Sequence, residues 1–171
     1  MESLLLSTQA LYPTKNDLSA GVRGQVIAIL NQHLADAVDL QTQTRMAHWN
    51  VKGPSFVALH KLFDEVHGAV AEYVDLIAER AVQLGGVAEG TARIAALRSN
   101  LVEYPCGIGA GSRHVEALSV ALAACGTGMR RAIDEVAWLG DAGTADLFTE
   151  IARGVDKWLW FVEAHSQSEP E

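Results

Sequence analysis

Residues 60–79, HKLFDEVHGAVAEYVDLIAE, decide the fold, because four side chains able to bind metal ions recur along them at helical intervals. These side chains are His60, Asp64, Asp75 and Glu79, at intervals of four, eleven and four residues. Each interval is close to a whole number of helical turns, so all four project from one stripe of a single helix. The rise from Asp64 to Asp75 is roughly 16 Å at about 1.5 Å per residue, several times a metal–ligand distance. One helix therefore cannot gather all four around one metal, and the stripe predicts a second copy of itself.

A two-fold axis across the middle of this helix would complete the stripe. An antiparallel second copy would place the His60 and Asp64 end of one helix against the Asp75 and Glu79 end of the other. Such an interface is self-complementary and contains two equivalent sites. His48, which closes the preceding predicted helix, can reach the same place. Histidine and carboxylate ligands together suit a divalent transition metal such as iron, manganese or zinc.

A structural interpretation of the same stripe stays open beside the metal site. The carboxylates would form surface ion pairs, for example Asp75 or Glu79 with Arg80, and the histidines would be ordinary, partly buried residues. Five such side chains at these intervals, on a helix that is otherwise apolar, favour the metal site.

Hydrophobic periodicity predicts four long helices and one short helix. The long helices are expected at about 19–49, 55–84, 112–139 and 144–164, and the short one near 91–98. Residues that favour helix starts open the long ones: Ser19, Ser55, Ser112 and Thr144. The connection between the second and third long helices is long enough to cross the bundle, whereas the other two are short. We therefore predict an all-α fold, a ferritin-like four-helix bundle with one long crossover carrying a short helix.

Length and composition fit one globular domain. The chain has 171 residues, of which 49% are hydrophobic and 20% charged. We expect an N-terminal tail over 1–18, the bundle over 19–165 and a C-terminal tail over 166–171. The two cysteines, Cys106 and Cys125, lie in no CxxC pattern, which argues against a cysteine metal site. No signal peptide or membrane span is evident, so a cytoplasmic location is expected.

Three segments of the chain carry a family resemblance. They are HWNVKGPSF at 48–56, FDE at 63–65 and DLIAER at 75–80, with His60 between the first two. They closely resemble the Dps family, the ferritin-like mini-ferritins of starved bacteria, and match that family's inter-subunit ferroxidase motif without an insertion. DKWLWF at 156–161 is similar to the family's closing helix. The resemblance covers about residues 19–165.

The resemblance implies a hollow shell of twelve identical subunits that protects the cell from oxidative damage. Ferrous iron would bind at the two-fold interface, be oxidised there and collect inside as ferric mineral. Hydrogen peroxide is the family's usual preferred oxidant, and oxygen is the other. By position, His48, His60 and Asp64 would come from one subunit and Asp75 and Glu79 from its mate.

Two further residues near the motif have open roles. Trp49 resembles the family's aromatic residue beside the site, which is thought to intercept stray oxidising equivalents; the alternative is a plain core tryptophan. His67 shares the face of His60 and Asp64. We hypothesise that His67 is an extra ligand, or holds one in place, and that it broadens metal choice toward zinc. The alternative is a histidine hydrogen-bonded at the dimer interface.

Three acidic residues near the start of the last helix are pore candidates. In the family, acidic residues at this place line three-fold pores that admit ferrous ions, and the positions here are Asp141, Asp146 and Glu150. The alternative for Asp141 is that its charge favours the N-terminus of the helix.

The charge balance bears on DNA, which the family name associates with the nucleoid. The net charge is −8, and Lys15 is the only basic residue in the first 18. Few phosphates could be neutralised, so we expect weak or absent DNA binding. Two other functions stay open: a DNA-condensing shell without significant oxidation, and a shell whose sites hold zinc with little turnover.

Overall fold

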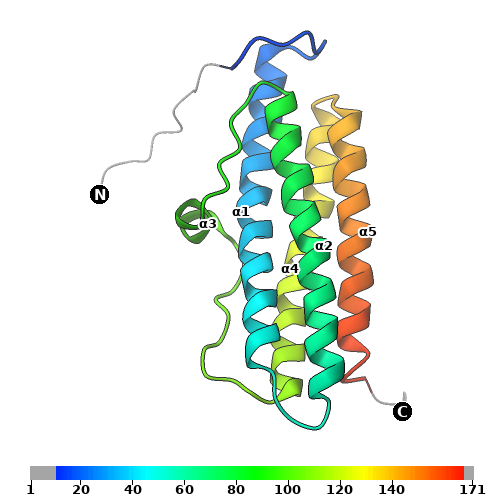
Figure 1. The fold of residues 1–171 in the computed structure, drawn as a ribbon. Helices are drawn as coiled ribbons and strands as arrows, with labels where there is room; N and C mark the ends of the chain where they lie inside the picture. Colours follow the sequence, from blue (N-terminus) through cyan, green and yellow to red (C-terminus); the bar gives the residue numbers. More distant parts are fainter. Residues whose placement is uncertain (1–10, 168–171) are drawn as a thin grey trace.

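The computed structural model describes residues 11–167. Its long helices lie side by side, and a short helix lies on the outer connection (Figure 1). The helices are α1 (Ala20–Asn50), α2 (Phe56–Gln83), α3 (Ala92–Arg98), α4 (Gly111–Trp138) and α5 (Ala142–Glu163). The long crossover runs from the end of α2 to the start of α4 and carries α3. This order confirms the predicted all-α bundle.

The four long helices share one apolar core. α1 packs along α2, α4 packs along α5, and the two pairs meet through contacts of α1 with α4 and of α2 with α5. The fully buried side chains include Phe63, Phe148, Leu30, Leu118 and Met129. Each buried side chain of this size contributes about 1.5–3 kcal/mol relative to an exposed one, so the bundle is a stiff support for residues on its surface.

Polar side chains of α1 hold the crossover in place. The Asn31 amide donates to the carbonyl of Val87 at 3.0 Å. Farther along α1, the buried Asp36 carboxylate accepts the N–H of Asn100 at 2.7 Å, and the Gln43 amide donates to another crossover carbonyl. These backbone groups of the crossover are therefore hydrogen-bonded to side chains of α1 rather than to solvent.

The start of α1 is confirmed, but two other predicted helix starts are wrong. Ser19 caps α1 as expected. Ser112 and Thr144 both lie inside their helices, because α4 begins after Ala110 and α5 after Asp141. The Asp141 carboxylate accepts the N–H of Thr144 at 3.0 Å, so aspartate rather than threonine caps α5.

Candidate metal centre

The turn between α1 and α2 brings His48 and His60 together. Gly53 in this turn has a φ of 109°, in the left-handed region that favours glycine. His48 lies in the last turn of α1 and His60 near the start of α2. Their rings stack with centroids 3.8 Å apart and planes inclined by 23°.

The two histidines hold each other in one tautomer. Nδ1 of His48 lies 2.8 Å from the carbonyl oxygen of His60, and Nδ1 of His60 lies 2.9 Å from the carbonyl oxygen of His48. A carbonyl oxygen only accepts, so each Nδ1 carries the proton and donates it. In the neutral ring this hydrogen bond leaves the lone pair on Nε2, the form in which histidine binds a metal.

Asp64 lies near this pair but is engaged elsewhere. It sits on α2, its side chain is 55% exposed, and its Oδ1 accepts a hydrogen bond from Nη1 of Arg45 at 2.8 Å. The same Oδ1 is 3.9 Å from Nδ1 of His48. Asp64 therefore lies beside the histidines, with one of its two oxygens held by Arg45.

Asp75 and Glu79 lie toward the other end of α2 and are exposed. Within residues 11–167, no ion pair involves either carboxylate, so both are open to a cation. The alternative interpretation of the stripe, surface ion pairs, predicted Arg80 as the partner of Asp75 or Glu79. The structure contradicts that pairing, because Arg80 binds Asp141 instead.

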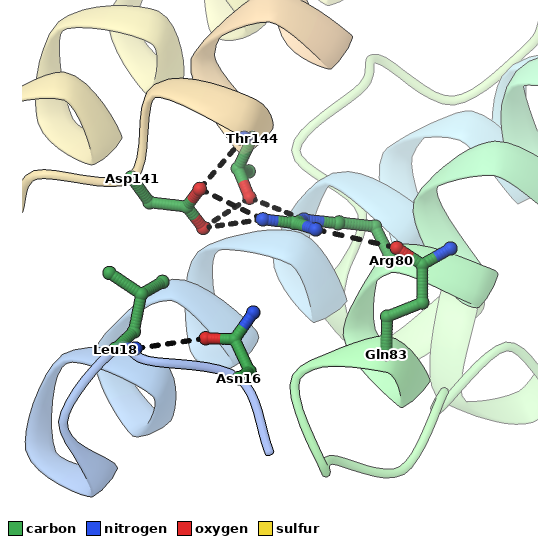
Figure 2. A network of polar contacts seen from close by, with 6 residues as sticks. All are labelled: Asn16, Leu18, Arg80, Gln83, Asp141 and Thr144. Atoms are coloured by element: carbon green, nitrogen blue, oxygen red, sulfur yellow. Dashed lines mark hydrogen bonds and ion pairs between the residues drawn. The ribbon is translucent and has the colours of Figure 1, made fainter. Parts of the chain in front are cut away.

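Figure 2 shows the Arg80 contacts at the junction of α2 and α5. Nη2 of Arg80 donates to both oxygens of Asp141, at 2.8 and 3.1 Å, and Nε donates to the Thr144 hydroxyl at 2.8 Å. Asp141 is 3% exposed and also caps α5. Its oxygens are thus fully engaged inside the protein, which favours the helix-terminus alternative over a pore-lining role.

The two other pore candidates, Asp146 and Glu150, are exposed and lie one turn apart on α5. Their role in a pore stays a prediction, because a pore would need further copies of the chain.

The stripe is divided within one chain. Among the residues that the structure describes, no three histidine, cysteine, aspartate or glutamate side chains form a group that could hold a metal ion. His48, His60 and Asp64 stand near one end of α2, and Asp75 and Glu79 stand toward the other, as the helical rise requires.

Trp49 lies on the surface, and His67 is hydrogen-bonded to α1. Trp49 is 69% exposed, so it is no core tryptophan of this chain. His67 is half-buried, and its Nδ1 donates to the carbonyl of Gln41 on α1 at 3.0 Å. Like the two stacked histidines, His67 keeps a lone pair on Nε2.

A buried pair of side chains, Tyr104 and His114, was not predicted from the sequence. The hydroxyl of Tyr104 lies 2.5 Å from Nδ1 of His114, which is fully buried at the start of α4. Burial lowers the pKa of His114, and burial raises the pKa of Tyr104. Arg45 was missed as well, although its position one helical turn before His48 was a usable signal.

Over residues 11–167, none of the helices combines the length and apolar character needed to cross a membrane.

Comparison with known proteins gives one consistent result. A family model described as the ferritin-like domain matches residues 27–169. A DNA protection during starvation protein from Agrobacterium fabrum is 43% identical over 156 residues, spanning 91% of this chain and 96% of the relative. The structure of DpsA14 from Streptomyces coelicolor has a TM-score of 0.87 at 33% identity, covering 92% of this chain and 95% of that one. A tetragonal form of Mycobacterium smegmatis Dps has a TM-score of 0.86 at 28% identity, covering 94% and 95%.

Proposed function

Because the chain belongs to the Dps family of ferritin-like proteins, we propose that it is a ferroxidase and iron-storage cage. It oxidises ferrous iron, preferably with hydrogen peroxide, and stores the ferric product as mineral in the cytoplasm, which protects the cell from oxidative damage. The observation that carries this proposal is the stacked pair His48 and His60, held with both Nε2 lone pairs free, on the helix that bears unpaired Asp75 and Glu79.

The oxidation site forms between two chains related by a two-fold axis. The imidazole nitrogens and Asp64 of one chain face Asp75 and Glu79 of a second, antiparallel α2. Neutral imidazole and carboxylate ligands bind ferrous ions and stabilise the higher charge of the ferric product. Two ferrous ions together supply two electrons, and solvent supplies two protons, so that one hydrogen peroxide becomes two water molecules and no hydroxyl radical is released.

We also propose how the chains assemble and how iron enters the cage. Twelve copies enclose the mineral, and the exposed Asp146 and Glu150 draw ferrous ions into a three-fold pore by their charge. Trp49, exposed beside His48, intercepts oxidising equivalents that leave the site.

The test is addition of ferrous iron to the metal-free protein without oxygen, followed by peroxide or oxygen, while ferric absorbance is recorded. Asp75→Asn and Glu79→Gln keep side-chain shape but remove ligand charge, and each should slow oxidation by more than about tenfold. Glu116→Gln is the matched control, because Glu116 is an exposed glutamate on α4 and not on the helix that carries the stripe. Wild-type rates in both ligand variants would overturn the proposed site.

The same experiment separates the open roles. His67→Ala should slow oxidation or weaken zinc binding if His67 is a ligand, and should change neither if it only bonds α1. Zinc suits the same nitrogen and oxygen ligands. A zinc-holding shell is favoured if neither oxidant produces ferric iron while zinc still binds and is lost in Asp75→Asn.

A further inference from the structure

Arg45 is the one cation in direct contact with a proposed iron ligand in the described part of the chain. It lies on α1, one helical turn before His48, and its side chain is 30% exposed. Its Nη1 donates to Oδ1 of Asp64 at 2.8 Å. Arginine stays protonated at any physiological pH, so this contact is a permanent ion pair in the metal-free protein.

The ion pair holds one oxygen of Asp64 near the histidine nitrogen that does not bind the metal. Oδ1 of Asp64 is 3.9 Å from Nδ1 of His48, the nitrogen already bonded to the carbonyl of His60. The ligand nitrogen of His48 is Nε2, whose lone pair points in a different direction. Arg45 holds Oδ1 of Asp64, so a metal ion that is to take this oxygen, or both oxygens of Asp64, has to displace the guanidinium.

We propose that Arg45 is a positioning residue that restrains Asp64 until a divalent cation displaces the guanidinium. The inference rests on the proposed function, because it takes Asp64 to be an iron ligand. Asp64 then has two positions, one on Arg45 in the empty site and one on the metal in the loaded site. A cation is held first by the histidines and by Asp75 and Glu79 of the second copy, and Asp64 joins afterwards.

The strength of the restraint follows from its exposure. Ion pairs between partly exposed side chains contribute little, up to about 1 kcal/mol, because water screens them. A metal ion can therefore displace Arg45, and removing Arg45 should tighten binding by about fivefold at most. The guanidinium also repels an approaching cation, which acts in the same direction.

The experiment is titration of assembled, metal-free protein with cobalt(II), followed by calorimetry and by the visible spectrum of the bound ion. Arg45→Gln should tighten cobalt binding by about threefold to fivefold. Arg45→Lys keeps the positive charge and should remain near the wild-type affinity. Thermal unfolding of each variant checks that the bundle is intact.

A double variant shows whether the effect passes through Asp64. In an Asp64→Asn background, Arg45→Gln should no longer change the affinity beyond its small general charge effect. Unchanged or weaker cobalt binding in Arg45→Gln, or an equal gain in the Asp64→Asn background, would overturn the role of Arg45.

The proposed site itself is tested separately, because cobalt binding does not require turnover. If Asp75→Asn weakens cobalt binding and Arg45→Gln has no effect, only the restraint is wrong. If Asp75→Asn leaves cobalt binding unchanged, the site of the proposed function is wrong, and the inference about Arg45 is wrong with it.

Discussion

Single hydrogen bonds influence the chemistry available at four of the six histidines of this chain. His48, His60 and His67 all donate from Nδ1 to a backbone carbonyl of the neighbouring helix. The backbone of the α1–α2 pair thus acts as a fixed acceptor that selects one tautomer three times. His114 differs, because its Nδ1 contacts the Tyr104 hydroxyl inside the protein. The first three are suited to metal binding and the fourth to packing.

His114 makes stability depend on pH. Burial lowers its pKa in the folded protein, so below about 6.5 the unfolded chain binds a proton more readily than the folded one. Stability should therefore fall as the pH is lowered from 7 to 5. In the double variant Tyr104→Phe/His114→Phe, both bonding partners become apolar and the fall should be smaller. Urea unfolding of metal-free protein at both pH values measures the difference.

The single variant Tyr104→Phe is the control, because it keeps the titrating imidazole and should keep the pH dependence. His33 contributes in the same direction, since burial lowers its pKa despite the opposing charges of Asp36 and Glu135. An equal fall in the double variant and the wild type would show that His114 does not contribute.

At the scale of helices, sequence periodicity located each element, but the starts of α4 and α5 were predicted a few residues too late. Ser19 was predicted from local chemistry and caps α1 through its own N-terminal turn. Asp141 caps α5 through an equally local bond to the N–H of Thr144, and aspartate is the stronger capping residue of the two. Its bond to Arg80, 61 residues earlier in the chain, follows from the packing of α2 against α5.

In the candidate site, too, some features follow from local sequence and others depend on how the helices pack. The proposed ligands could be selected from the sequence because helical spacing is a local property that can be read from residue intervals. The contact of Arg45 with Asp64 spans 19 residues across two helices, and its direction depends on how α1 and α2 pack. No spacing rule contains that information.

The junction of α2 and α5 should be a sensitive point of the bundle. Asp141→Ala removes the cap of α5 and leaves the guanidinium of Arg80 without its buried partner. We expect a loss of roughly 3 kcal/mol in the free energy of unfolding. Chemical denaturation of the variant and the wild type measures it.

Asp141→Asn separates the two contributions, because asparagine caps a helix well but carries no charge. It should cost less than Asp141→Ala. Asp146→Ala, at an exposed site on the same helix, should stay within about 0.5 kcal/mol of the wild type. If Asp141→Ala is no more harmful than Asp146→Ala, the junction does not stabilise the bundle.

At the scale of the whole molecule, charge separates iron binding from DNA binding. The chain carries 21 acidic and 13 basic side chains, and four of the arginines are already held in ion pairs with carboxylates. An acidic surface attracts ferrous ions, but it repels phosphates. The same excess of carboxylates thus favours one partner and disfavours the other.

We therefore expect the assembled protein to leave duplex DNA unshifted in a gel at about 150 mM salt, because each phosphate contact loses affinity steeply as salt rises. A variant with lysines at Ser3, Ser7, Thr8 and Gln9 should bind DNA and release it as salt is raised. A second variant with glutamines at the same positions controls for the changed segment and should remain unbound. Tight binding by the wild-type protein at that salt would mean that a surface of the bundle, rather than a basic segment, contacts the phosphates.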